Sequence, residues 1–510
     1  MTPPATHQPG EPEVKTAAGR VRGREEDGLT VFRGIPFAQP PVGEARFAAP
    51  GPVQPWDGVR DALEFGPLPP QATWRGMAPS VEVTGDEWLT LNVWTPDPAP
   101  AVGRPVMVWI YGGAYMMGTG AAPAYDGSRL AHEGDLVVVT FNYRVGVEGF
   151  AQISGAPANR GLLDQVAALE WVRDNIAAFG GDPDQVTVFG ESAGAGSLAS
   201  LLAMPRAKGL FRRAIVQSLT GSFFSPELAE DIASEIAAEL GLSATVADLS
   251  GVDAGRLTAA GDAVDAKLSQ YERRWGPVAR SMTPFAPVVD GDVLPTTPWE
   301  ALADGAAREV ELIVGHNEDE YRMFLALGGL LGQVSDDQAA DTLRALGPGP
   351  DAERAYRDAF PQASAEELYE RVQSDSTFRM PTLRLAEAQV AGGGKAYVYE
   401  LTWDAPGSDG IFGSTHFLDV PLVFGNLTAD QAPVLLGPEP SAETEAISAH
   451  FRKAWTSFAR TGDPGWPAFD AERRLVQVID TEPTVTVYPE DDTRRLWQDH
   501  SFQPLPLLEK

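Results

Sequence analysis

One serine, set between two glycines, constrains this chain more than any other feature. Strand-like residues 186–189 run directly into Gly-Glu-Ser-Ala-Gly at 190–194, and small residues that suit a helix follow at 195–203. A serine on so sharp a strand-to-helix turn sits in strained backbone, and only glycine, which lacks a Cβ, fits two residues to either side. The pattern predicts an exposed Ser192 hydroxyl, with the Ala193 N–H at the helix start facing developing negative charge.

The order of elements predicts an α/β fold. Short apolar strands alternate with amphipathic helices between residues 106 and 217, which implies a central, mostly parallel sheet with helices on both faces. Two largely helical stretches follow, at about 225–275 and 330–390. Insertions of this kind usually cap a site above the sheet and shape its pocket.

Length and composition indicate one large domain. The 510 residues exceed the usual domain length, yet no linker rich in Pro, Gly or Ser divides them. We expect a disordered, proline-rich tail at 1–13 and a single domain at 14–510. The chain has no cysteine, which suits a reducing cytoplasm, and shows neither a signal peptide nor an apolar run of about 18 residues.

The charge balance argues against two classes of partner. Lys and Arg total 39 and Asp and Glu total 71, so the formal net charge is −32. Nucleic acid and anionic membranes are repelled by such a surface. We therefore expect no nucleic-acid or membrane partner, and a monomer or weak homo-oligomer.

A serine nucleophile needs a general base, and the histidines are few enough for elimination. Of six histidines, four fall in the tail, in helical runs or at the charged C-terminal end. His316 and His416 remain, and both are predicted in loops after strands. His416 lies downstream of the acid-rich turn at 315–320, which matches the order serine, acid, histidine found with this kind of turn.

The orienting acid and the oxyanion donors are less sharply defined by the residues themselves. Glu318, Asp319 and Glu320 stand side by side. If the turn is extended, the two glutamates point the same way, so alternation does not choose between them. Gly-Gly-Ala at 112–114 follows the strand predicted at 106–110, where a second source of backbone N–H donors is needed.

Taken together, these motifs give the chain a resemblance to the type-B carboxylesterases. That family also contains the cholinesterases and bacterial para-nitrobenzyl esterases. The resemblance covers nearly the whole chain, and its further motifs lie at residues 32–38, 91–96, 142–144, 159–165, 171–194 and 423–425. It implies an α/β-hydrolase fold and a serine carboxylesterase that works through an acyl-enzyme.

The resemblance also implies the roles of individual residues. It places the nucleophile at Ser192, the base at His416 and the acid at Glu320. In relatives a serine closes the strand after the nucleophile helix and supports the acid, and here that position is Ser218. No metal or organic cofactor is implied. The oxyanion donors fall on the backbone N–H groups of Gly113, Ala114 and Ala193.

The chain departs from the family pattern in its loops. Tyr321 replaces the glycine that usually follows the acid, and this change is expected to shift the loop or narrow the pocket. Pro69 and Trp88 stand where secreted members have the cysteines of an early disulfide. The short segment between them argues against a deep gorge, and Trp74 within it is a candidate for the entrance.

Alternative functions and the pocket lining stay open at this stage. A non-catalytic binding or adhesion protein on the same fold is one alternative, although such relatives usually lack a triad member. An amidase or polyester hydrolase that uses the same triad is another. The candidates for an apolar acyl pocket, which flank the site in sequence, are Tyr115, Met116, Met117, Phe223 and Phe224.

Overall fold

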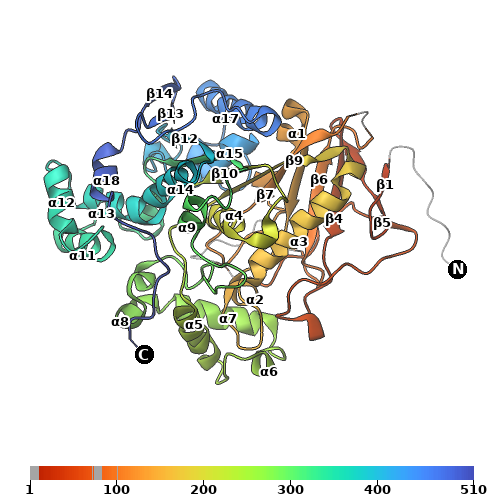
Figure 1. The fold of residues 1–510 in the computed structure, drawn as a ribbon, viewed down its shortest axis with the longest axis horizontal. Helices are drawn as coiled ribbons and strands as arrows, with labels where there is room; N and C mark the ends of the chain where they lie inside the picture. The colour runs from red at the N-terminus through yellow and green to blue at the C-terminus, as the bar shows by residue number, and fades with distance from the viewer. Residues whose placement is uncertain (1–10, 72, 74–82, 100–101, 510) are drawn as a thin grey trace.

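The computed structural model describes residues 11–71, 73, 83–99 and 102–509. Within them, eleven strands form one sheet in the order β14-β13-β12-β11-β10-β9-β7-β8-β6-β4-β3 (Figure 1). The strands from β8 to β13 pair in parallel, and antiparallel pairs close both edges. The prediction of a central, mostly parallel sheet is confirmed.

The strand bounds follow the apolar runs of the sequence. β7, β8, β9 and β10 are buried along most of their lengths, as expected for strands covered on both faces. The strands of the large sheet are β3 (Arg24–Glu26), β4 (Leu29–Pro36), β6 (Thr90–Thr95), β7 (Arg104–Ile110), β8 (Val137–Phe141), β9 (Gly181–Glu191), β10 (Arg213–Gln217), β11 (Glu311–Asn317), β12 (Lys395–Leu401), β13 (Leu475–Ile479) and β14 (Thr484–Val487).

Helices cover both faces of this sheet (Figure 1). One layer contains α3 (Arg160–Asn175), α4 (Ala193–Ala203), α9 (Pro298–Ala303) and α14 (Met380–Ala391). The other contains α1 (Ser128–Gly134), α15 (Asp419–Phe424) and α17 (Ala442–Thr461). No helix in the described ranges is both long enough and apolar enough to cross a membrane.

Two groups of helices extend from the sheet at the positions of the predicted insertions (Figure 1). The first comprises α5 (Pro226–Ala238), α6 (Val246–Leu249), α7 (Ala254–Asp265) and α8 (Glu272–Trp275), and the second α11 (Asp336–Leu346), α12 (Ala352–Ala359) and α13 (Ala365–Ser374). The second predicted insertion extends too far, to residue 390. Its last part is α14, which packs on β11 and β12 and so belongs to the layer that covers the sheet.

The predicted tail, residues 1–13, includes a residue that the structure places in a strand. Residues 1–10 lie outside the described part. Glu13, assigned to the tail, is the first residue of β1 (Glu13–Lys15), which pairs with β2 (Arg20–Arg22), itself paired with β5 (Val59–Asp61). The alternation of burial along β1, with only Val14 buried, provides the apolar anchor for this small sheet.

The topology collects the candidate residues at one edge. β7, β9, β10, β11 and β12 are neighbours and run in parallel, so the loops after their carboxyl ends meet at the same side of the sheet. Ligands of open α/β sheets bind outside these carboxyl ends. The loops in question begin at residues 111, 192, 218, 318 and 402.

Candidate active site

Ser192 occupies the strained turn that its flanking glycines predict. Its backbone has φ 56° and ψ −122°, and its N–H donates to the Gln217 carbonyl over 3.0 Å. A Cβ on Gly194 would lie 2.1 Å from the carbonyl oxygen of Ile110, and one on Gly190 would lie 2.8 Å from the same atom. Both glycines are therefore required by the close approach of β7, and the turn cannot relax.

The start of α4 supplies backbone donors beside this serine. The first hydrogen bond of the helix runs from the Gly196 N–H to the Ser192 carbonyl over 2.9 Å. The N–H of Ala193 precedes that bond, so it has no partner within the helix and carries the partial positive charge of a helix start. Ala193 is fully buried, which keeps this donor out of bulk water.

The loop after β7 lies against the same serine. A Cβ on Gly112 would lie 3.0 Å from the Ser192 Cβ. Gly113 and Ala114 both have left-handed backbones, with φ 111° and φ 55°, and Ala114 is a non-glycine residue in a strained region. Such a turn points successive N–H groups to one side. The two predicted groups of oxyanion donors therefore flank Ser192.

His416 is oriented by a buried glutamate. Its Nδ1 lies 2.6 Å from Glu320 Oε2. The Oε1 atom of Glu320 accepts the Ser218 hydroxyl over 2.6 Å and the Asn317 N–H over 2.9 Å. Burial alone would raise the pKa of Glu320, but His416 and these donors outweigh it and hold the pKa below the usual value. The geometry thus requires Nδ1 to carry its proton and leaves Nε2 for the pocket.

The neighbouring acids make different contacts. Asp319 Oδ2 accepts the Ser414 N–H over 3.0 Å, so this carboxylate fastens the loop that carries His416. Glu318 forms no ion pair with His416 among the described residues, and burial followed by the charge of Asp319 raises its pKa to about 7. Of the three adjacent acids, Glu320 is the one in contact with the imidazole.

Two aromatic rings and a second carboxylate complete the surroundings of His416. The Phe378 ring centre lies 4.2 Å from the imidazole centre, and that of Phe324 lies 5.4 Å away. Glu191 Oε1 is 3.0 Å from Nε2, so a second carboxylate faces the imidazole on its other side. Burial opposes protonation, yet Glu191 and Glu320 together raise the pKa of His416 above its usual 6.5.

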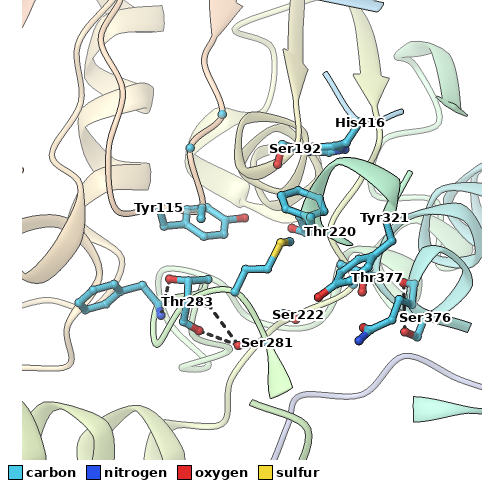
Figure 2. Close-up of a pocket in the computed structure, with 18 of the residues that line it drawn as sticks. Tyr115, Ser192, Thr220, Ser222, Ser281, Thr283, Tyr321, Ser376, Thr377 and His416 are labelled. Carbon is cyan, nitrogen blue, oxygen red and sulfur yellow. Dashed lines mark hydrogen bonds between the residues drawn. The ribbon is translucent and has the colours of Figure 1, made fainter. Parts of the chain in front are cut away.

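Ser192 and His416 open onto the same cavity (Figure 2). Their side chains are nearly buried, with 8% and 4% of each residue exposed. Within the described residues, no hydrogen bond joins Ser192 Oγ to His416. Catalytic hydrogen bonds are often long before substrate binds and tighten on the path to the transition state.

The other candidate histidine is not part of this site. His316 was predicted in a loop, but it lies within β11 and is fully buried. Its Nε2 accepts from the Tyr488 hydroxyl over 2.9 Å, and its Nδ1 lies 3.1 Å from the Asn317 carbonyl. Burial, with a smaller contribution from Arg379, lowers the pKa of His316 to about 4, so it is a neutral packing residue.

A comparison with known protein families identifies the family of this chain. The model of the Carboxylesterase family matches residues 10–497. The chain belongs to the carboxylesterase family. Its activity is the hydrolysis of carboxylic esters, and the α/β-hydrolase fold of its structural neighbours is the fold described above.

Bacterial esterases are among its relatives. The chain is 38% identical to the para-nitrobenzyl esterase of Bacillus subtilis (strain 168), over 94% of this chain and 97% of that protein. It is 36% identical to the phenmedipham hydrolase of Pseudarthrobacter oxydans, over 92% and 95%. The crystal structure of carboxylesterase EST55 from Geobacillus stearothermophilus superposes with a TM-score of 0.83 at 39% identity, over 95% of this chain and 100% of that one.

The cavity of this carboxylesterase has a volume of about 480 Å³. Tyr115 and Met117 line it as predicted, whereas Met116, Phe223 and Phe224 are buried and do not. The prediction failed for these three because apolar residues next to a site in sequence pack equally well into the core. Trp74, the candidate for the entrance, lies outside the described residues.

The structure also shows how the loop after Glu320 accommodates Tyr321 in place of the usual glycine. Tyr321 has φ −88°, which any residue adopts, so the loop after Glu320 does not need the usual glycine here. Its side chain lines the cavity. Sequence reasoning missed Glu191, Phe324 and Phe378 around His416. Glu191 could have been noticed because it directly precedes the nucleophile, but no motif marks Phe378.

Proposed function

We propose that Ser192, His416 and Glu320 are the catalytic triad of this carboxylesterase. The observation that carries the proposal is the 2.6 Å contact between His416 Nδ1 and Glu320 Oε2, made in a cavity that Ser192 also lines. A buried carboxylate in this place fixes the imidazole tautomer and stabilises the imidazolium that forms during reaction. Ser218, which donates to Glu320, holds the carboxylate in position.

The proposed reaction follows from this arrangement. Nε2 of His416 accepts the Ser192 proton as Oγ attacks the ester carbonyl. The imidazolium then donates that proton to the departing alkoxide, which leaves an acyl group on Ser192. A water molecule, deprotonated by the same nitrogen, hydrolyses the acyl-enzyme and releases the acid.

We propose that the N–H groups of Gly113, Ala114 and Ala193 bind the oxyanion. Their support is the left-handed turn at Gly113 and Ala114 and the helix start at Ala193, which lie on either side of Ser192. Preorganised donors of this kind act where charge develops and need no reorganisation during the reaction. No step of this mechanism uses a metal or an organic cofactor.

The proposed substrates are small-molecule esters. Two relatives are named for a para-nitrobenzyl ester and for phenmedipham, and the cavity of about 480 Å³ suits molecules of that size. An amidase or polyester hydrolase that uses the same triad is the second candidate. A non-catalytic role is disfavoured because all three triad positions carry functional side chains.

Further properties of the protein are also proposals. The net charge of −32 supports the absence of nucleic-acid and anionic membrane partners. We propose a cytoplasmic protein, since a chain without cysteine suits a reducing compartment. A monomer or weak homo-oligomer remains the proposed assembly state.

A panel of substrates tests the proposed function. p-Nitrophenyl esters of graded acyl length, one matched p-nitroanilide and one ester of a bulky alcohol are compared with the purified chain. Turnover of the esters with little or no release of p-nitroaniline is the expected result. Absence of turnover for every ester contradicts the proposal, and faster cleavage of the anilide identifies an amidase.

A further inference from the structure

One wall of the cavity carries neutral polar side chains from three separate parts of the chain. We call this set the polar rim, and its members are Ser222, Ser281, Thr283, Gln373, Ser376 and Thr377. They come from the loop after β10, the loop after the short helix η6 (Gly276–Arg280), and the end of α13 with the π-turn η7 (Asp375–Arg379). Figure 2 shows Ser222, Ser281 and Thr283 across the cavity from Ser192 and His416.

The polar rim has hydrogen-bonding capacity that the protein leaves unused. The hydroxyls of Ser222 and Thr377 and the amide of Gln373 form no hydrogen bond with any residue in the described ranges. Gln373 is 4% exposed and Ser222 and Thr377 are half-buried, and the polar atoms of all three are open to the cavity. The Thr283 hydroxyl accepts the Phe285 N–H over 3.1 Å, and its own proton stays available. A ligand hydroxyl or amide can take the place of the water that hydrates these groups, so a ligand that pairs with them gains affinity.

The charged side chains of the cavity disfavour a negatively charged ligand relative to a neutral one. Its charged side chains, apart from the histidines, are Glu191, Arg280 and Asp430. Arg280 Nε is already paired with Glu272 over 2.9 Å. A ligand carboxylate would therefore meet two carboxylates, and the one arginine of the described lining already shares its charge with Glu272. A neutral hydroxyl, ether or amide meets no such repulsion.

Apolar side chains line the same cavity as the polar rim and the triad. Met282, Phe324 and Phe417 are among them, and Phe324 also contacts the His416 ring. A ligand that reaches from Ser192 to the polar rim therefore meets apolar groups as well as hydroxyls and an amide. Apolar surface favours the methylene part of such a ligand, and the rim favours a polar end.

The covalent intermediate favours the acyl group as the part of the substrate that meets this wall. In the proposed mechanism His416 protonates the departing alkoxide, and the alcohol leaves, whereas the acyl group stays bound to Ser192 until water releases it. Ser222, Ser281 and Thr283 lie across the cavity from Ser192 and His416 (Figure 2), and we assign the acyl chain to them.

We infer that this carboxylesterase prefers esters whose acyl chain carries a neutral hydrogen-bonding group at its far end. The inference rests on the proposed function, because it assumes that acylation occurs at Ser192. An acyl chain with a terminal carboxylate is disfavoured by the two carboxylates of the cavity. The substrate class is thus hydroxy-, alkoxy- or amido-acyl esters.

Matched p-nitrophenyl esters test the inference with a constant leaving group. The 6-hydroxyhexanoate is compared with the isosteric heptanoate, the 8-hydroxyoctanoate with the nonanoate, and the half ester of adipic acid serves as the carboxylate probe. An apolar pocket disfavours an added hydroxyl by up to about 100-fold in kcat/KM. We expect the hydroxylated ester to equal or exceed its plain partner at one length at least, and the adipate to be the slowest substrate.

Two isosteric variants locate the effect. Thr377→Val and Gln373→Met remove a hydroxyl and an amide at nearly constant volume, and each should lower the ratio of hydroxylated to plain kcat/KM by about three- to tenfold, the value of one hydrogen bond. Met282→Leu, in the apolar part of the same cavity, is the control and should leave that ratio unchanged. Thermal unfolding of each variant checks that the fold is intact.

The outcomes separate this inference from the proposed function. If the plain esters are turned over but the hydroxylated ones are at least tenfold slower at both lengths, the inference is wrong and the triad proposal stands. A ratio that falls equally in Met282→Leu also overturns it, because the rim would then have no specific role. If no ester is turned over, the proposed function itself fails.

Discussion

The triad and the polar rim line the same cavity but are built in opposite ways. Glu320 is fully buried and contacts three partners, which come from the ends of β10 and β11 and from the loop that carries His416. The hydroxyls of Ser222 and Thr377 of the rim have no hydrogen-bond partner among the described residues, and both residues lie on segments beside the helical insertions. Hydrogen bonds within the protein thus fix the position of the triad, whereas the polar rim keeps hydrogen-bonding groups that a ligand can use.

This difference separates chemistry from selectivity. The ends of parallel strands hold the reacting groups in fixed positions, as positioned nucleophiles and bases require. The insertions add a wall whose side chains can change without disturbing the sheet. A substitution in the triad should therefore act on kcat for every ester, whereas one in the rim should change the relative rates of different esters.

The largest effect is expected at the nucleophile. Ser192→Ala removes the attacking oxygen but keeps the Cβ that the turn already accommodates, so the fold should persist. We expect kcat to fall on the order of 10⁴-fold or more for every ester. Steady-state kinetics with thermal unfolding as the control measures this. A loss of kcat that differs from one ester to another would contradict the division between the triad and the polar rim, because Ser192 would then contribute to substrate selectivity.

The next effect concerns the acid that orients the base. Glu320→Gln keeps the shape of the side chain but favours the wrong tautomer of His416, and kcat should fall roughly 10³–10⁴-fold with little change in KM. Asp319→Asn and Glu318→Gln are the matched controls, since neither carboxylate contacts the imidazole. A large loss in Glu318→Gln alongside an active Glu320→Gln would show that the acid is misassigned.

Glu191 tests the electrostatic link between the triad and the pocket. His416 must be neutral to accept a proton, and two carboxylates raise its pKa, so kcat/KM should rise with pH through a midpoint above 6.5. Glu191→Gln removes one of these charges, and the midpoint should move to lower pH by about one unit. The pH profile of kcat/KM measures this shift. An unchanged midpoint means that Glu191 does not influence the base.

The smallest effect is on stability. Burial raises the pKa of Glu318 to about 7 in the folded protein from its ordinary value of 4.5. A carboxyl with a raised pKa stabilises the fold when protonated, and this contribution is lost as pH rises from 4.5 through 7. Glu318→Gln should therefore increase the free energy of unfolding at pH 8 by about 1 kcal/mol. Denaturant unfolding at pH 5 and pH 8 measures it, and an equal change at both values contradicts the assignment.

The sequence predicted the parts of the molecule that depend on local backbone constraints. The Gly-Glu-Ser-Ala-Gly turn implies the strand before it and the helix after it, because only glycine permits the approach that the structure shows. The sheet and its helix layers followed from alternating apolar strands and amphipathic helices. Alternation alone did not choose among the three acids, and the resemblance to the carboxylesterases selected Glu320.

The remainder could not be predicted because it depends on contacts between distant segments. Phe378 reaches His416 through a π-turn that has no sequence motif. His316 resembles His416 in its position near a strand end, and only its burial within β11 separates the two. The end of the second insertion was misplaced because α14 has the same helical pattern whether it covers the sheet or caps the site.

Covalent labelling of the serine is the most direct test of the central claim, that Ser192 is the nucleophile activated by His416. The purified chain is treated with a p-nitrophenyl dialkyl phosphate, and the release of p-nitrophenol and the labelled peptide are measured by absorbance and mass spectrometry. The account predicts one phosphoryl group per chain, on Ser192, with no labelling of Ser192→Ala and much slower labelling of Glu320→Gln. Stoichiometric labelling at another residue, or undiminished ester turnover after Ser192 is fully labelled, would contradict it.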